Sequence, residues 1–252
     1  LLSDGEKYTE EIDTSTGSVS TLSETEWVDK NSAASHILAL KIATLCNEAF
    51  IENPAESLER WIVRGRPTEK ALLLAGIQAG LNKKELERVE PKIAELPFDS
   101  VYKYSATLHK IDEENILYVA GAPEIILKKS KYLNIDGRED ILSEDKIKEL
   151  NKKCEELAGK GQRVLATGYR KIRNPKSPWP YGQGEIRNLE ELVNDLTFVG
   201  FIALHDPIRK EVKEAIRICR QAGMKPIIVT GDHKLTAKAV AEELGFKVKE
   251  QN

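Results

Sequence analysis

The stretch that decides the fold is Tyr102-Lys-Tyr-Ser-Ala-Thr-Leu-His-Lys-Ile111, followed by Asp112-Glu-Glu-Asn115 and Ile116-Leu-Tyr-Val-Ala120. Two runs rich in aromatic and aliphatic residues are joined by a short polar loop, which is the pattern of a β-hairpin. Lys92–Phe98 before it and Arg163–Tyr169 after it have the same character and are predicted to be strands. The two strands of such a hairpin run antiparallel.

Helical segments surround these strands. Helices are predicted for Ser35–Phe50, for the segment that Pro67 begins, for Lys83–Glu90, from Gly121 to about Tyr132, and for Ser143–Ala158. Asp136-Gly137 predicts a turn. Residues 1–30 are expected to form an edge hairpin or a mobile arm, and the Pro- and Gly-rich insert Asn174–Gly184 has no assigned role.

The C-terminal segment has a β-α-β pattern. An apolar run, Leu196–Leu204, ends in His-Asp206-Pro-Ile-Arg209, and a second, Pro226-Ile-Ile-Val, ends in Thr230-Gly231-Asp232. A third strand is expected to begin at Phe246-Lys-Val248. Parallel strands deliver such polar residues to the carboxyl edge of a sheet, where ligands bind, so phosphate chemistry is the first hypothesis. About fifty residues are too few for a complete domain of this kind, so the remaining strands are expected outside the chain or on a partner.

Composition excludes several classes of protein. A net charge of -3 with 31% charged residues describes an ordinary soluble surface and gives no reason to expect nucleic acid or an anionic membrane as partner. The three cysteines are far apart, and neither they nor the four histidines have ligand spacing, so no metal site or disulfide is predicted. The apolar runs are too short to cross a bilayer. The start at Leu1-Leu-Ser-Asp-Gly suggests a segment of a longer protein.

Six spaced signatures occur in one order along the chain. They are Gly65-x-Pro-Thr68-Glu69-x-Ala-Leu72, Pro97-Phe98-Asp-Ser100-x-x-Lys103, Gly121-Ala-Pro-Glu124, Gly161-x-Arg163-Val-Leu165-Ala, Asp206-Pro-x-Arg209 and Thr230-Gly-Asp232. The ordered set resembles the cytoplasmic headpiece of P-type cation-transporting ATPases and covers essentially the whole chain. The sequence from Asp195 to Val212 most closely resembles the branch that contains calcium pumps.

The resemblance implies an architecture and a setting. Residues 1–203 would be the nucleotide-binding domain, with an antiparallel sheet of six to seven strands flanked by helices. Residues 204–252 would be an incomplete part of the phosphorylation domain, which has a haloacid-dehalogenase-like parallel fold. The chain would then be a cytoplasmic part of an integral membrane protein. Its partners would be ATP or ADP, Mg²⁺ carried with the nucleotide, and the remaining phosphorylation, actuator and transmembrane domains, with no nucleic acid.

The resemblance also implies residue roles. Phe98 would stack on adenine, and Lys103 would contribute positive charge to the pocket. Glu69 would accept a hydrogen bond from the adenosine, and Arg163 would reach the phosphates. The remaining members of the nucleotide-binding set are Gly121 and Ala122, which would let the backbone approach the base, and Leu165.

The same residues allow simpler interpretations. A phenylalanine is by default a core residue, and only the surrounding motif favours the pocket for Phe98. Lys103 equally suits a solvated strand position, and Arg163 suits a strand edge. Glu69 suits the first turn of a helix, whose dipole favours a carboxylate, and both of its roles can hold at once. Gly121 with Ala122 equally suits a plain strand-to-helix turn.

The C-terminal signatures imply two further sites. Asp206, Pro207 and Arg209 match a hinge between the two domains. Thr230, Gly231 and Asp232 match the loop that faces the transferred phosphate, although Asp232 also suits the N-cap of the following helix.

Two departures from the family pattern affect the expected function. Ala120 stands where the family usually has a lysine, and the lost cation should weaken nucleotide binding or change its selectivity. The phosphorylated Asp-Lys-Thr-Gly-Thr sequence and the later Gly-Asp-Gly-x-Asn-Asp sequence do not occur in these residues. The chain is therefore expected to bind nucleotide without turning it over. The alternatives are a non-catalytic regulatory or interaction module, and a haloacid-dehalogenase-like phosphatase that uses Thr230 and Asp232.

Overall fold

The computed structural model describes most of the 252 residues. Residues 2–3, 6–7, 11–12 and 19–20 form short strands. From there the structure describes residues 33–57, 60–112, 114–173, 189–205, 208, 210–229 and 234–246. The insert Asn174–Gly184 lies outside the described residues.

Nine strands of the described residues form one large sheet, and seven of them lie side by side in the order β11-β10-β13-β12-β9-β8-β7. Neighbouring strands are antiparallel except for β10 and β13, which are parallel. The hairpin predicted from Tyr102–Ala120 is confirmed, because Leu108 on β8 lies opposite Leu117 on β9. The strands of the path are β7 Lys92–Asp99, β8 Tyr104–Ile111, β9 Glu114–Gly121, β10 Ser130–Ile135, β11 Arg138–Ile141, β12 Arg163–Arg173 and β13 Leu196–Leu204.

The sheet is slightly larger than the six to seven strands expected. The additions come from the N-terminal segment, where β1 (Leu2–Ser3) and β2 (Glu6–Lys7) form a hairpin. This hairpin joins the sheet through Leu2, which lies opposite Phe201 on β13. A second small pair, β3 (Glu11–Ile12) with β4 (Val19–Ser20), stands apart from the large sheet.

The run Leu196–Leu204 belongs to this sheet, so its interpretation as the first strand of a parallel β-α-β unit was wrong. β13 pairs antiparallel with β12 from Arg163↔Leu204 to Tyr169↔Thr197, and parallel with β10 on its other side. An apolar run buried on both faces has no period that distinguishes the two kinds of sheet, and residues 196–202 are all buried here.

Strand β10 replaces the end of a predicted helix. The helix expected to reach about Tyr132 is α4, Pro123–Lys129, and the chain becomes extended at Ser130. Pairing with β13 buries Leu133 and Asn134, so tertiary contacts outweigh local propensity at this point. The turn Asp136-Gly137 is confirmed, because both residues have positive φ, at 48° and 84°, as a two-residue hairpin turn requires.

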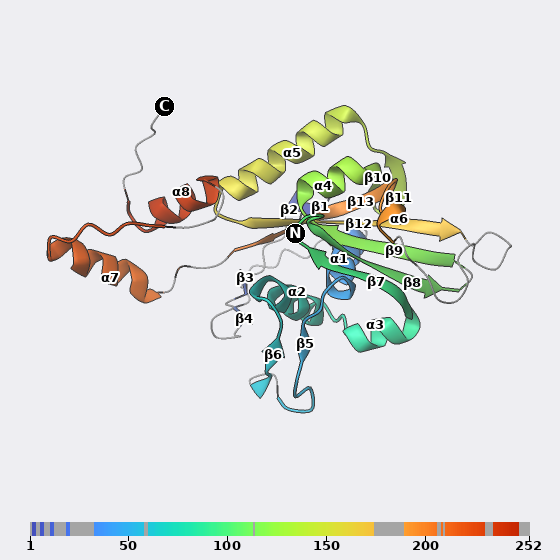
Figure 1. Ribbon diagram of the computed structural model, residues 1–252, viewed down its shortest axis with the longest axis horizontal. Coiled ribbons are helices and arrows are strands. Elements are labelled where there is room, and N and C mark those ends of the chain that lie inside the picture. Colours follow the sequence, from blue (N-terminus) through green and yellow to red (C-terminus); the bar gives the residue numbers. More distant parts are fainter. Residues whose placement is uncertain are drawn as a thin grey trace.

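Helices cover both faces of the sheet (Figure 1). On one face α1 (Ala33–Leu45) packs on β9, β12 and β13, and its Ile42 and Leu45 are fully buried. On the other face α4 and α5 (Glu144–Gly159) pack over a core centred on Phe198 and Phe201. Helix α6 (Leu189–Leu192) leads into β13.

Helix α2 (Pro67–Gln78) packs beside α1, and α3 (Lys83–Val89) leads into β7. The helix predicted for Ser35–Phe50 ends earlier, at Leu45, because Phe50 begins a short strand. That strand, β5 (Phe50–Ile51), pairs with β6 (Val63–Arg64) in a hairpin that projects from the body of the molecule (Figure 1).

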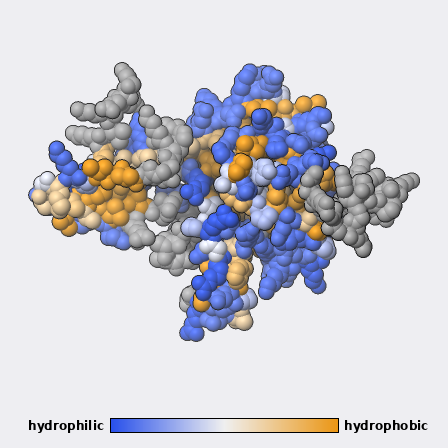
Figure 2. All heavy atoms as spheres, viewed as in Figure 1, coloured by the Kyte–Doolittle hydropathy of each residue, from blue (hydrophilic) through white to orange (hydrophobic). Residues whose placement is uncertain are grey.

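The C-terminal segment carries two helices, α7 (Lys210–Gln221) and α8 (Lys234–Glu243), and α8 contacts α5. The strand predicted at Pro226–Val229 is not present, and Phe246 is not in a strand either. An apolar surface gathers here (Figure 2), formed by the exposed side chains of Ile218, Met224, Ile227, Ile228 and Val229. A strand needs a neighbouring strand to pair with, and the described residues supply none at this point.

None of the helices in the described part of the chain combines the length and the apolarity that crossing a bilayer requires.

A buried polar cluster lies between α1 and the sheet. Glu90 forms an ion pair with Lys41 and accepts a hydrogen bond from the Tyr118 hydroxyl at 2.9 Å. The His109 ring is fully buried, and its Nδ1 lies 2.8 Å from the carbonyl oxygen of Glu90. Its Nε2 has no hydrogen-bond partner among the described residues. Burial lowers the pKa of His109 below its usual 6.5, and the neighbouring Glu90 offsets this only partly.

We expect this histidine to make the fold sensitive to acid. Because the pKa of His109 is lower in the folded state, the unfolded chain binds more protons below about pH 6.5, and the free energy of unfolding falls as the pH drops through that range. Each unit of lowering is worth about 1.4 kcal/mol. Urea unfolding measures the free energy of unfolding at pH 7.5 and at pH 5.5. The decrease between the two pH values should be smaller for His109→Gln than for the wild type. The exposed His205, changed to Gln, should leave this decrease unaltered; equal decreases in all three proteins would contradict the assignment.

Candidate functional site

The residues predicted to bind nucleotide gather at one end of the sheet. Strand β7 ends next to Phe98, β9 ends at Gly121, and β12 begins at Arg163. The register ties these ends together, because Gly121 lies opposite Tyr104 on one side and Ala166 on the other. The first turn of α2 lies across the same end and contacts both flanks, through Phe98 and Arg163. The sheet thus brings together residues from four separate parts of the sequence.

The first turn of α2 is organised by Glu69. Its carboxylate accepts a hydrogen bond from the backbone N–H of Arg66 at 3.0 Å and lies 3.5 Å from the Arg66 Nε. Pro67 occupies the first helical position, where no N–H is needed. The first-turn position expected for Glu69 is therefore confirmed, and its carboxylate also caps the helix. A role toward adenosine remains a separate prediction.

Phe98 is not a core residue. Its side chain is 42% exposed at the end of β7, and the guanidinium carbon of Arg66 lies 5.4 Å from the ring centroid. An exposed aromatic face with a cation over it is a surface for stacking, and it contributes little to the stability of a core. The structure therefore contradicts the core interpretation of Phe98, and its role toward adenine stays a prediction.

Lys103 lies in the turn before β8, one residue outside the strand predicted for it. Its φ of 59° is unusual for a residue other than glycine. The turn is fixed by Asp99, whose carbonyl accepts the Lys103 N–H at 2.7 Å and whose carboxylate accepts the Val101 N–H at 2.6 Å. The Lys103 Nζ lies 3.2 Å from a carboxylate oxygen of Glu124, and both side chains are more than half exposed. The ammonium group can therefore exchange this partner for an anionic ligand at little cost.

Gly121 marks a close approach of two strands. A Cβ atom at this position would lie 2.4 Å from the Tyr104 Cβ and 2.6 Å from the Lys103 carbonyl oxygen, so only glycine fits. The next residue, Ala122, donates its N–H to the same carbonyl at 2.9 Å and precedes α4 as its N-cap. The Lys103 turn and the end of β9 are thus held as one unit.

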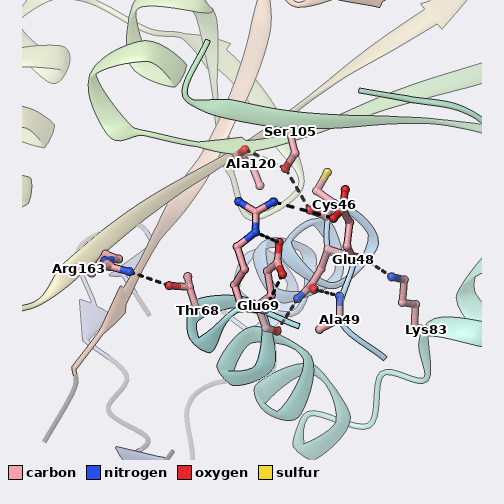
Figure 3. A network of polar contacts seen from close by, with 11 residues as sticks. Cys46, Glu48, Ala49, Thr68, Glu69, Lys83, Ser105, Ala120 and Arg163 are labelled. Atoms are coloured by element: carbon pink, nitrogen blue, oxygen red, sulfur yellow. Dashed lines mark hydrogen bonds and ion pairs between the residues drawn. The ribbon is translucent and has the colours of Figure 1, made fainter. Parts of the chain in front are cut away.

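Arg163 begins β12 at an exposed position and donates a hydrogen bond to the Thr68 hydroxyl at 3.0 Å (Figure 3). Leu165 is half-buried, and it packs against clusters formed by α1 and α2. The described partner of the Arg163 guanidinium is a neutral hydroxyl, so it keeps its capacity to bind an anion.

Ala120 forms part of the buried floor beneath the site. It is 4% exposed and packs with α1, and the Ser105 hydroxyl donates to the Cys46 carbonyl at 3.0 Å beside it (Figure 3). Burial raises the pKa of the Cys46 thiol to about 12, so the thiol is not a nucleophile at neutral pH. The floor is thus uncharged at this point.

Lys83, near this buried surface, is held by a hydrogen bond to the backbone. Lys83 donates to the Asn47 carbonyl, and burial lowers the pKa of its ammonium group. Asn47 in turn joins the α1 and α2 ends, through a hydrogen bond to the Glu69 carbonyl at 2.7 Å. Figure 3 shows Lys83 on the side of this network away from Arg163.

Several predicted site residues cannot be placed. The hinge residues Asp206, Pro207 and Arg209 and the phosphate-facing Thr230, Gly231 and Asp232 lie outside the described residues. Within the described residues, no group of three or more His, Cys, Asp and Glu side chains has the arrangement of a metal site.

Sequence reasoning missed Arg66 and Ser105, and also Glu48, whose carboxylate lies 4.0 Å from the Arg66 guanidinium. The signal for Arg66 was available, because it directly precedes Pro67-Thr68-Glu69 at a helix start. Its contact with Phe98, 32 residues along the chain, needs the folded sheet, and no sequence pattern encodes it.

Comparison with known proteins gives a consistent family. A family model described as P-type ATPase, cytoplasmic domain N, matches residues 36–211. The sodium/potassium-transporting ATPase subunit alpha of Drosophila melanogaster is 35% identical over 213 residues, or 82% of this chain and 20% of that protein. The calcium-transporting ATPase of Bacillus subtilis (strain 168) is 34% identical over 206 residues, or 81% of this chain and 22% of that protein. The sodium/potassium-transporting ATPase subunit alpha of Tetronarce californica is 35% identical over 223 residues, which are 86% of this chain and 22% of that protein.

The chain belongs to the P-type ATPase family, and the part that the family model matches is its cytoplasmic domain N. The expected family and the expected cytoplasmic placement of this domain are therefore confirmed. The calcium-transporting branch is among the relatives, at an identity close to that of the sodium/potassium-transporting proteins. The chain spans about a fifth of the length of the curated relatives it matches.

Proposed function

We propose that the chain is the ATP-binding part of a cation-transporting pump and presents ATP for phosphoryl transfer to an aspartate elsewhere in the parent protein. One observation carries this proposal: the exposed ring of Phe98 lies at the sheet end that also holds Lys103, Gly121 and Arg163. An aromatic face and two cations are what an adenine nucleotide needs for its base and its phosphates.

Within this proposal each residue has a role. Phe98 stacks on the base, and Gly121 and Ala122 hold the Lys103 turn against the end of β9 beside it. Glu69 accepts a hydrogen bond from the adenosine. Lys103 and Arg163 face the phosphates after exchanging their present partners, Glu124 and Thr68. Leu165 supports the pocket from the half-buried side of the sheet.

The metal of the reaction fits the same arrangement. We infer that Mg²⁺ arrives with the nucleotide phosphates, since Glu69 and Glu124, two of the described carboxylates near the site, are already paired with cations. When bound, the ion neutralises phosphate charge. This chain's own residues bind and orient the nucleotide.

We also propose the domain division 1–203 and 204–252, with the second part an incomplete phosphorylation domain. The exposed apolar residues around α7 support it, because an apolar surface of this kind is covered when the rest of a domain is present. The remaining phosphorylation, actuator and transmembrane domains of the parent would be the partners. Asp206, Pro207 and Arg209 would form the hinge, and Thr230, Gly231 and Asp232 the loop that faces the phosphate.

Titration of the chain with ATP and with adenosine tests the proposal. We expect ATP to bind with a dissociation constant of about 0.1–10 mM, typical of a site open on one side. Arg163→Ala should weaken ATP binding about fivefold or more and leave adenosine binding nearly unchanged, because the guanidinium acts on phosphate oxygens. Calorimetry or NMR titration measures both.

Arg138→Ala is the matched control, because Arg138 is an exposed arginine at the start of β11, on the opposite edge of the sheet. It should leave both affinities within about twofold. If the wild-type chain binds neither ligand, the nucleotide-binding proposal fails and a non-catalytic interaction module takes its place. If Arg163→Ala and Arg138→Ala behave alike, only the role of Arg163 is wrong.

A further inference from the structure

The cation over the Phe98 ring comes from a residue that none of the sequence motifs fixes. Arg66 occupies the variable position of Gly65-x-Pro-Thr68-Glu69, and its guanidinium carbon lies 5.4 Å from the centroid of the Phe98 ring. A planar guanidinium can stack on an aromatic face and equally on a purine, because both present a π surface. Arg66 therefore presents a planar cation that can stack on the purine base of a nucleotide bound at this site.

Two carboxylates lie near the Arg66 guanidinium and orient it. The Nε of Arg66 lies 3.5 Å from Glu69, and one terminal nitrogen lies 4.0 Å from Glu48. Both distances are long for ion pairs, and the Arg66 side chain is 54% exposed. The contacts direct the guanidinium toward Phe98 without fixing it, so a small outward movement costs little.

We propose that Arg66 binds the nucleotide base, with its guanidinium and the Phe98 ring forming two walls between which a purine inserts. This inference rests on the proposed function and adds to it a residue that determines affinity for the base. The neighbouring carboxylates, Glu48 and Glu69, keep the outer wall in position when the base is absent.

The distances set what must move. A purine between two planes needs about 3.5 Å on each side, or about 7 Å between the outer planes. The Arg66 guanidinium carbon lies 5.4 Å from the centroid of the Phe98 ring, which is less than this spacing, so the guanidinium must shift outward when the base enters. The exposed Arg66 side chain can make this shift by rotation, whereas Phe98 is anchored at the end of β7.

Titration of the 252-residue chain with adenosine and with ATP tests the role of Arg66. Arg66→Ala should weaken the binding of both ligands by the same factor, about three- to tenfold, because the lost contact is to the base that they share. Arg66→Lys keeps the charge and loses the plane, so it should weaken adenosine binding almost as much as the alanine variant. The cap of α2 survives in both variants, since it uses the backbone N–H of residue 66.

Arg64→Ala is the matched control. Arg64 lies two residues away on β6, is 58% exposed and is paired with Glu52, so its removal makes the same change of charge. It should leave both affinities within about twofold. Tighter binding by Arg66→Ala would mean that the guanidinium only blocks Phe98, and would overturn the proposal. A loss confined to ATP, or no difference from Arg64→Ala, would overturn it as well. A wild-type chain that binds neither ligand would refute the proposed function itself.

Discussion

Phe98→Ala is expected to weaken the binding of ATP and adenosine by about tenfold or more. Stacking of a base on an aromatic side chain is worth about 1–3 kcal/mol, and alanine leaves no surface of comparable area. The ring is 42% exposed and is not part of the described cores, so its removal should change the free energy of unfolding by less than about 1 kcal/mol. Calorimetric titration and urea unfolding of the same variant separate the two effects.

Phe50→Ala is the matched control for this prediction. Phe50 is 57% exposed on β5, in the hairpin that projects from the body of the molecule (Figure 1). Its replacement removes the same side chain at a place with no proposed ligand contact. Equal affinities for the two variants would contradict the stacking role of Phe98. A large loss of stability in Phe98→Ala would instead mean that the ring supports the fold.

The sequence predicted local features of the fold well where the signal was local. The hairpin of β8 and β9 has an alternating pattern and a polar loop, and the turn Asp136-Gly137 has residues that tolerate positive φ. The start of α2 follows from Pro67 and Glu69. Each of these depends on contacts within a few residues, which a single sequence records.

Pairings between distant segments could not be predicted in the same way. Whether the run Leu196–Leu204 joins a parallel or an antiparallel sheet depends on β10 and β12, and the run itself is apolar throughout. β10 pairs with β11 through the local turn and with β13 on its other side, and only the second pairing joins distant segments. The same is true of the candidate site. Phe98 and Arg163 could be identified because they belong to sequence motifs. The contact of Arg66 with Phe98 depends on how α2 lies against the sheet, which no motif records.

Gly121→Ala is expected to have the largest effect on stability of the substitutions considered. The new Cβ would lie 2.4 Å from the Tyr104 Cβ, 2.7 Å from the Tyr104 Cα and 2.6 Å from the Lys103 carbonyl oxygen. Two of these atoms are backbone, so the clash cannot be relieved by a side-chain rotation, and β8 must separate from β9. Overpacking of this kind costs about 3 kcal/mol, or a fall in Tm of roughly 6–12 °C for a chain of this size. Nucleotide affinity should fall as well, since the hydrogen bond from Ala122 to the Lys103 carbonyl holds the turn in place.

Gly159→Ala makes the same chemical change where there is room for it. Gly159 is the last residue of α5, and a Cβ there meets nothing within 4 Å. Alanine is the better helix former, so this variant should match the wild type or gain up to about 1 kcal/mol. Thermal unfolding of the two variants measures the contrast. Similar Tm values for the two variants would show that β8 and β9 can separate at this point without loss of stability. The close packing at Gly121 would then not be needed to hold the end of β9 against the Lys103 turn.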